Sequence, residues 1–262
     1  MRIATWNVNS INARIEHLVR YIKQDNSDIY LLQELKCIND NFPYDQIENL
    51  GYKAYVNGQK AWNGVAILSK NKLEILNDKI PTLRKDENSR FIETEIKLSK
   101  IKQAIKLFCI YLPNGNPIET DKFDYKINWM KKFNDYILDL NNRNIPMIIG
   151  GDFNVIPTDD DVYSPENYIN DACAHPKTRE QYRFLTNSGF TDVVKYFIVG
   201  KTNWTYWGYR GGGWQKGNGV RIDHFLTSPD VTDLIKSVKI NREPRGWDKA
   251  SDHTPVQLKL ID

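Results

Sequence analysis

The sequence predicts an α/β fold in which β-sheets pack against each other and helices cover the outer faces. Three observations favour this class. Predicted strands outnumber predicted helices, each long helix carries an apolar stripe, and no internal repeat, linker or low-complexity tract interrupts the 262 residues. A chain of this length can bury one large core or two stacked layers. We therefore predict a single domain over residues 1–262.

Short apolar or alternating runs bounded by glycine, proline and asparagine predict the strands. They are expected at residues 2–8, 28–34, 52–56, 65–69, 91–96, 105–111, 147–149, 222–227, 238–241 and 256–260. Pro113 and Gly115 close the strand that ends at Tyr111. Periodicity alone does not determine the strand order.

Apolar residues at helical spacing predict a first helix from Ile11, with Ser10 at the N-cap position. Thr120 is expected to cap a second helix that ends before Pro146. Its apolar stripe consists of Phe123, Ile127, Met130, Phe133 and Ile137. A shorter helix is expected over residues 178–187, ended by Gly189.

Composition narrows the cellular context. The three cysteines (Cys37, Cys109 and Cys173) lack the spacing of a zinc site or a disulfide framework. No run of eighteen apolar residues and no secretory leader is visible, so we expect a cytoplasmic protein with no membrane association. The formal charge of +3 does not by itself indicate nucleic-acid binding. We expect a monomer without an obligate protein partner.

Polar side chains recur where predicted strands end: Asn7, Glu34, Tyr111, Asp152 and Asn154. Side chains at the strand ends of a rigid scaffold can converge on one crevice. Carboxylates, amides and a phenol suit phosphate chemistry better than acyl transfer, because phosphodiester hydrolysis needs charge neutralisation, an aligned water and a stabilised leaving group. The C-terminal third adds Asp223, Asp252 and His253, in Arg221-Ile222-Asp223 and Ser251-Asp252-His253.

Each group has a candidate role. Glu34 is the first candidate ligand for Mg²⁺, with Mn²⁺ as a substitute. Asp152 orients or deprotonates the attacking water, steadied by Asn154, which would face the same way on an extended segment. His253 donates to the phosphate or acts as the base, and Asp223 orients it. Tyr111 donates to the phosphate or leaving group. The candidate metal set is Asn7, Glu34, Asp152, Asn154, Asp252 and His253.

A basic and aromatic stretch points to nucleic acid. Between Lys201 and Ile222 there is no aspartate or glutamate, while cations alternate with aromatics around three glycines. The candidate DNA contacts are Tyr206, Trp207, Arg210, Trp214 and Lys216, with Arg90 from elsewhere in the chain. Ordinary packing of the aromatics against the glycines remains the alternative.

Together these motifs resemble the exonuclease III type of apurinic/apyrimidinic endonuclease over nearly the whole chain. The matching residues are Trp6-Asn7-Val8-Asn9, Gln33-Glu34, Gly51-Tyr52, Gly58-Gln59-Lys60, Tyr111-Leu112-Pro113-Asn114-Gly115, Gly151-Asp152-Phe153-Asn154, Arg221-Ile222-Asp223 and Ser251-Asp252-His253. The resemblance implies a four-layered α/β sandwich with two mixed sheets. It also implies Mg²⁺-dependent incision of double-stranded DNA 5′ to abasic sites and trimming of damaged 3′ ends, with Tyr206 and Trp207 beside the abasic sugar.

Departures from the family pattern leave substrate preference open. Ser10 stands where many relatives have glycine, and the segment 159–179 differs from the best-known bacterial pattern. His175 or Trp214 could occlude the pocket and favour 3′-end processing. Asp159-Asp160-Asp161 is interpreted as a turn or helix start, and His17 and His224 as structural residues. A phosphatase or phosphodiesterase acting on a lipid or inositol headgroup, and an inactive DNA-binding module, remain as alternative functions.

Overall fold

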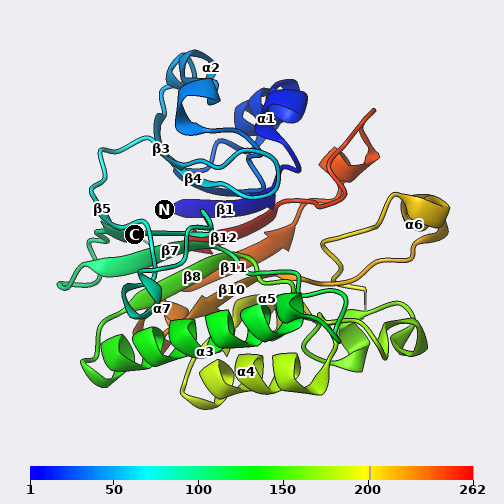
Figure 1. The fold of residues 1–262 in the computed structure, drawn as a ribbon. Coiled ribbons are helices and arrows are strands. Elements are labelled where there is room, and N and C mark those ends of the chain that lie inside the picture. The colour runs from blue at the N-terminus through cyan, green and yellow to red at the C-terminus, as the bar shows by residue number, and fades with distance from the viewer. Residues whose placement is uncertain (201, 262) are drawn as a thin grey trace.

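Two six-stranded mixed sheets lie face to face in the computed structural model, which describes residues 1–200 and 202–261 (Figure 1). The first sheet has the order β11-β12-β1-β2-β4-β3 and the second the order β5-β6-β7-β8-β10-β9. In each sheet one central pair is parallel, β1 with β2 and β7 with β8, and the other pairs are antiparallel. The strands are β1 Arg2–Asn7, β2 Ile29–Gln33, β3 Lys53–Asn57, β4 Val65–Ser69, β5 Ile75–Asn77, β6 Phe91–Ile96, β7 Ile105–Tyr111, β8 Met147–Asp152, β9 Thr191–Asp192, β10 Asp223–Thr227, β11 Ile235–Ile240 and β12 Val256–Leu260.

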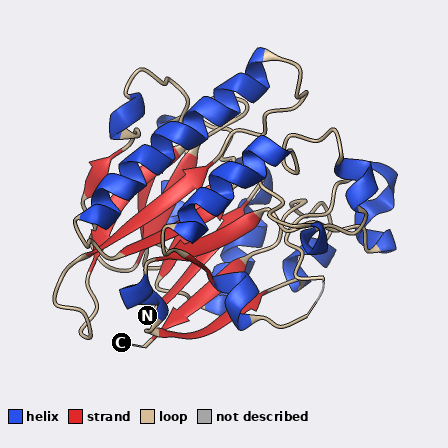
Figure 2. Ribbon diagram, turned by 90° about the horizontal axis from the view of Figure 1, so that it is seen from below, coloured by secondary structure: helices blue, strands red, loops and turns tan. Residues whose placement is uncertain are grey.

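Helices cover the outer face of each sheet and complete the four layers. α1 Ile11–Asp25 and α2 Tyr44–Glu48 lie on the first sheet, and α3 Asp121–Asn142 and α4 Pro176–Asn187 lie side by side on the second (Figures 1 and 2). The short helices are α5 Val193–Phe197, α6 Gly213–Lys216 and α7 Pro229–Thr232. The 3₁₀ helices are η1 Asn39–Asn41, η2 Pro81–Leu83, η3 Asp159–Asp161, η4 Pro165–Tyr168, η5 Arg210–Gly212 and η6 Glu243–Gly246.

The largest apolar cluster fills the space between the two sheets. Leu31 and Ile67 of the first sheet and Leu107, Ile148 and Phe225 of the second belong to it, and all five are fully buried. Separate clusters lie under α1 and under α3 and α4. Strands buried on both faces read as continuous apolar runs, which explains why strands were predicted at 28–34, 65–69 and 147–149. Within residues 1–200 and 202–261 no helix could span a membrane.

The predicted fold class is confirmed. The predicted and observed elements differ in their end residues and in short elements that were not predicted. β5 and β9 were missed because three and two residues are too short to show a pattern. Ser10 and Thr120 precede helices as expected, but neither side chain caps. The Thr120 hydroxyl instead donates to the Pro117 carbonyl. Ile127 is only half-buried, whereas Trp129, outside the predicted stripe, is buried in the core under α3.

Candidate active site

Five of the candidate polar residues meet at one end of the sandwich because the strand pairing places them there. Asn7 ends β1, and Glu34 directly follows the parallel strand β2. Tyr111 ends β7 and pairs in register with Asp152 at the end of the parallel strand β8. Asp223 begins the antiparallel strand β10 and pairs with Asp152 from the other side. The sheets therefore gather residues from five segments of the chain.

Unusual backbone conformations turn these side chains into the site. Glu34 and Asn154 have φ angles of 54° and 48°, in the left-handed region that most residues avoid. At Gly151 a Cβ atom would lie 2.0 Å from the Ile110 carbonyl oxygen, so only glycine allows β8 to approach β7 here. The predicted extended segment from Asp152 to Asn154 is therefore wrong. Asn154 instead turns back and donates its backbone N–H to Asp152 Oδ1 at 2.9 Å.

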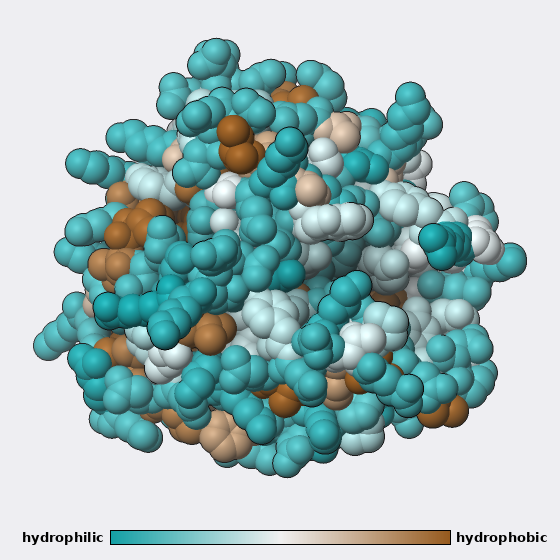
Figure 3. Space-filling model, viewed as in Figure 1, coloured by the Kyte–Doolittle hydropathy of each residue, from teal (hydrophilic) through white to brown (hydrophobic). Residues whose placement is uncertain are grey.

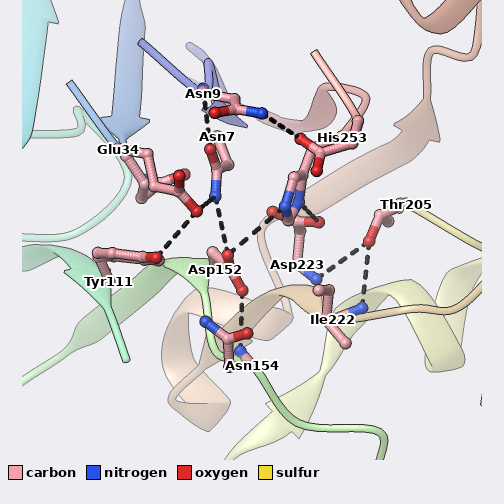
Figure 4. A network of polar contacts seen from close by, with 12 residues as sticks. Asn7, Asn9, Glu34, Tyr111, Asp152, Asn154, Thr205, Ile222, Asp223 and His253 are labelled. Atoms are coloured by element: carbon pink, nitrogen blue, oxygen red, sulfur yellow. Dashed lines mark hydrogen bonds and ion pairs between the residues drawn. The ribbon is translucent and has the colours of Figure 1, made fainter. Parts of the chain in front are cut away.

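Asn7 joins the two central carboxylates. Its Nδ2 donates to Glu34 Oε1 and to Asp152 Oδ2, each at 2.9 Å (Figure 4). Its Oδ1 accepts the Asn9 backbone N–H at 3.0 Å, which fixes the orientation of the amide, because a backbone N–H needs an oxygen acceptor. Asn7 thus holds Glu34 and Asp152 in place. Its role as a metal ligand stays a prediction.

Glu34 is held as an ionised carboxylate. Tyr111 donates its hydroxyl to Glu34 Oε1 at 2.8 Å, and Lys36 Nζ lies 2.9 Å from Oε2. Burial raises the pKa of Glu34, but Lys36 and the Asn7 hydrogen bond outweigh it and lower that pKa below its usual value. Lys36 was missed from sequence, since a lysine two residues after a strand carries no signal of its own.

Tyr111 keeps its proton and is oriented by Arg90. Burial, with the Glu34 charge, raises the pKa of the Tyr111 phenol well above its usual value. Arg90 Nη1 donates to the Tyr111 carbonyl at 3.2 Å, and its guanidinium carbon lies 4.9 Å from the phenol ring centroid. The phenol therefore keeps its proton at neutral pH and is available as a hydrogen-bond donor or proton donor.

Asp223 and His253 form the predicted pair. His253 Nδ1 lies 2.9 Å from Asp223 Oδ2, and Nε2 lies 3.8 Å from Asp152 Oδ2. Burial lowers the pKa of His253, but the Asp223 and Asp152 carboxylates outweigh burial and raise it above its usual value. Thr205, which was not predicted, accepts the Ile222 and Asp223 backbone N–H groups at 3.2 and 3.1 Å and so positions the start of β10.

Asp152 has the opposite electrostatic environment from Glu34. Burial raises the pKa of the Asp152 carboxyl, and the neighbouring Asp223 and Glu34 charges add to this, although His253 opposes it. Two carboxylates in one site thus have pKa values moved in opposite directions. Such a separation is typical of sites in which one carboxylate stays charged and the other exchanges a proton.

Glu34 and Asp152 could hold a cation, and His253 could join them only with Nε2 unprotonated. They offer one ligand atom each, and these atoms lie within 4.8 Å of one another, in the only such group found among the described residues. Two carboxylates bound to one amide and facing a cleft fit a hard divalent ion, which prefers oxygen ligands. Asp252 is outside this group and accepts Asn9 Nδ2 at 2.9 Å. It does line the cleft.

Asn154 belongs to the support of the site. Its Nδ2 donates to the Leu112 carbonyl at 2.9 Å and its Oδ1 accepts Asn114 Nδ2 at 3.1 Å, so both ends of the amide are engaged. The fully buried Lys126 donates to the Asn154 and Asn114 carbonyls at 2.6 and 3.0 Å. The loops after β7 and β8 are thereby joined behind Asp152.

The site opens into a cleft of about 290 Å³ with two chemically different halves. One half is acidic and contains the candidate metal ligands. The other is largely apolar and aromatic, and is formed by Ile156, Tyr168, Tyr206, Val220 and Ile222. Tyr206 also packs against the His253 ring, with centroids 4.9 Å apart. The cleft thus combines a charged floor with an apolar wall.

Comparison with known proteins identifies the family of the chain. Residues 4–253 match the model of the endonuclease/exonuclease/phosphatase family. The chain belongs to this family. Among curated members, exodeoxyribonuclease III of Haemophilus influenzae is 30% identical over 98% of both chains. A DNA-(apurinic or apyrimidinic site) endonuclease of Dictyostelium discoideum is 30% identical, over 98% of this chain and 69% of that protein.

Solved structures of the family share the whole fold. A Neisseria 3′ phosphatase bound to a product DNA hairpin is 31% identical, with a TM-score of 0.92 over 100% of both chains. An AP endonuclease from Archaeoglobus fulgidus is 30% identical, with a TM-score of 0.91, again over 100% of both chains. The four-layered sandwich implied by the sequence resemblance is therefore confirmed.

The basic aromatic loop is only partly available to a ligand. Trp207 is 2% exposed, so the prediction that it contacts DNA is wrong. It packs edge-on against Trp214, whose ring centroid is 4.9 Å away, and under the Arg242 guanidinium. Trp214 does not line the cleft, so it cannot occlude the pocket as suggested. For Trp207, packing was the correct alternative, whereas the half-buried Trp214 stays a predicted DNA contact.

The remaining candidates of the loop have different positions. Tyr206 lines the cleft. Arg210 and Lys216 do not line it and are exposed to solvent. Lys201 lies outside the described residues. Tyr206, Arg210 and Lys216 stay predicted DNA contacts.

The segment 159–179 lines the cleft through residues that were not predicted. His175 is wrongly assigned to the pocket, since it precedes α4 and its ring packs 4.6 Å from Phe123. Tyr168 and Asp171 reach the cleft instead. Asp159–Asp161 is the expected turn, a 3₁₀ helix capped by Thr158.

A buried cation anchors this segment to β10. Arg221, 1% exposed, donates from Nε to Asp161 Oδ1 at 2.8 Å and from Nη1 to Asp192 Oδ1 at 2.9 Å. Burial raises the pKa values of both aspartates, but Arg221 outweighs burial and lowers them. His224 is fully buried, contacts Arg221 and the Val155 carbonyl, and is structural as expected.

Proposed function

We propose that this chain is a Mg²⁺-dependent DNA-repair nuclease that hydrolyses the phosphodiester 5′ to abasic sites and trims blocked 3′ ends. The observation that carries the proposal is the convergence of Glu34, Asp152 and His253 from three distant segments, with ligand atoms within 4.8 Å of one another. The names of the relatives, exodeoxyribonuclease III and AP endonuclease, support the substrate class. Duplex DNA would be the partner of a cytoplasmic monomer.

The opposed pKa shifts of Glu34 and Asp152 support different roles for the two carboxylates. Glu34, whose pKa is lowered, would hold the ion together with a carboxylate oxygen of Asp152. When bound, Mg²⁺ neutralises charge on the nonbridging phosphate oxygens. Asp152, whose pKa is raised toward neutrality, orients the attacking water and accepts its proton.

Two further side chains act as donors. His253 is kept as an imidazolium by Asp223, so it donates a hydrogen bond to the phosphate and does not serve as the base. Of the two roles that the sequence left open for His253, the raised pKa favours the donor. Tyr111, whose pKa is raised, donates its proton or a hydrogen bond toward the leaving oxygen.

The apolar wall of the cleft fits the rest of the substrate. Tyr168, Tyr206 and Ile222 offer a surface on which a deoxyribose without its base can pack. A lipid substrate is disfavoured, because the face in Figure 3 is largely hydrophilic, with apolar residues scattered over it. An inactive module is disfavoured because every catalytic position is filled.

A gel assay tests the proposal. A labelled duplex with one internal abasic site is incubated with the protein in Mg²⁺ and in chelator, together with Asp152→Ala and the control Asp160→Ala, which changes an exposed acid of η3. We expect nicking by the wild type and Asp160→Ala in Mg²⁺ only, and none by Asp152→Ala. Chelator-resistant cutting would falsify the metal assignment. A parallel duplex with a 3′-phosphate compares end trimming with internal incision.

A further inference from the structure

A second groove adjoins the cleft on the far side of Tyr111. It has a volume of about 430 Å³, within the range of about 300–1,000 Å³ that small-molecule sites occupy. It shares the lining residues Tyr111, Asn114 and Asn116 with the cleft, so the two hollows lie side by side. Its other lining residues are Trp62, Asn63, Asn88, Arg90, Pro113, Gly115, Lys122 and Tyr125. We call it the Trp62 groove.

The charge of the Trp62 groove is opposite to that of the cleft. Arg90 and Lys122 line it, and none of its described lining residues is acidic. The cleft has Glu34, Asp152 and other carboxylates along its floor. Cations, amides and aromatic rings together favour a ligand that carries a phosphate and a flat ring.

Trp62 is the feature that the catalytic site does not explain. Its side chain is 76% exposed, the most of any described phenylalanine, tyrosine or tryptophan. An indole contributes most to stability when buried, so this residue adds little to the core. Tyrosine and tryptophan left at a surface supply large, rigid contact area at low entropic cost.

The loop that presents Trp62 is anchored on both sides. Asn63 Nδ2 donates to Gln59 Oε1 at 2.9 Å and to Asn88 Oδ1 at 3.0 Å. The Gly64 N–H donates to the Ser89 carbonyl at 2.9 Å. The Ser89 N–H donates to Gln59 Oε1 at 2.8 Å. These bonds order the backbone on both sides of Trp62 before any ligand arrives, which lowers the ordering cost of binding.

We propose that the Trp62 groove binds an unpaired nucleotide of the DNA substrate, with its base stacked on Trp62 and its phosphate beside Lys122 and Arg90. The inference rests on the proposed nuclease function and extends it. Only a base that has left the duplex stack offers a free face to an indole, so the ligand is an unpaired and not a paired nucleotide. The enzyme would then prefer ends or gaps with single-stranded extensions over blunt duplexes.

Binding measured in chelator, where the strand is not cut, tests the groove. The probes are a fluorescent blunt duplex and the same duplex with a short unpaired 3′ extension, and the readout is anisotropy. We expect the extension to strengthen wild-type binding by at least about fivefold, the lower range for stacking of one base on an aromatic ring. Trp62→Ala loses this advantage, and Trp62→Phe keeps part of it. The matched control Tyr196→Ala, at a 68% exposed aromatic of α5, keeps all of it.

Charge is tested separately on α3. Lys122→Gln should weaken binding of the extended probe and reduce its salt dependence by about one phosphate contact, whereas Lys131→Gln, exposed on the same helix, should not. If the extension gives no advantage, or if Trp62→Ala keeps it, the groove assignment is wrong. When the wild type nevertheless cuts abasic DNA, the proposed function survives that result. When the wild type neither binds nor cuts DNA, both proposals fail.

Discussion

Replacing Asp223 with asparagine removes a buried negative charge from beside His253 while keeping the shape of the side chain. Asp223 is fully buried, and its Oδ2 lies 2.9 Å from His253 Nδ1. Its other oxygen, Oδ1, has no hydrogen-bond partner among the described residues. The substitution therefore affects one interaction, the charge-assisted bond to the imidazole.

The magnitude follows from that bond. A hydrogen bond between charged groups contributes about 1.5–3 kcal/mol. If His253 donates to the phosphate mainly in the transition state, loss of its positive charge weakens that bond. We expect kcat to fall by about 10- to 150-fold with little change in KM. Stability should change by less than about 1 kcal/mol, or about 2–4 °C in Tm. The reason is that His253 can give up its proton, and the amide NH2 only replaces an oxygen that already lacked a partner.

Two measurements check this prediction. Single-turnover cleavage of an abasic duplex gives kcat, and imidazole NMR resonances followed against pH give the protonation of His253. In the wild type the two carboxylates raise the pKa of His253, so the ring is charged at neutral pH. In Asp223→Asn its titration midpoint should move to lower pH. An unchanged kcat alongside a shifted midpoint would refute the donor role, and an unchanged midpoint would refute the electrostatic argument.

Three further substitutions test the support of the site. Trp207→Ala should lower the free energy of unfolding, measured by urea denaturation, by about 3–5 kcal/mol, because the ring is buried. The folded fraction should bind DNA normally. Lost DNA affinity at full stability would contradict this prediction. Arg221→Met should cost about 3–5 kcal/mol at neutral pH. Arg221 lowers the pKa of both aspartates that pair with it, so its contribution is present above their unfolded pKa and is lost as pH falls; a Tm deficit equal at all pH values would count against it. Lys126→Met should lower kcat more than Lys131→Met, because two buried carbonyls lose their donor.

The strands and most catalytic residue types were readable from sequence because they depend on local patterns. Apolar runs ended by polar residues predicted β1, β2, β7 and β8 and the groups that follow them. Those groups do converge, since parallel pairing brings Asn7 next to Glu34, and Tyr111 next to Asp152. The Asp223 and His253 pair was likewise predicted from their residue types.

Contacts between distant segments decided the remainder. Asn7 was predicted as a ligand, but its amide turns to join two carboxylates. Trp207 was expected at the DNA and is buried by Arg242 and Trp214. The sequence has no periodic pattern that shows which side chain covers a residue. It also has none that shows in which direction an amide points.

From its sequence alone, this protein's fold class, its family resemblance and the chemical groups of its site could be determined, because periodicity and residue type are properties of short segments. Only the tertiary structure separated the pKa values of the two carboxylates, lowering that of Glu34 and raising that of Asp152. That separation comes from Lys36 beside Glu34 and from the burial of Asp152. Burial and the distance between charges exist only once the chain has folded, and they determine a pKa.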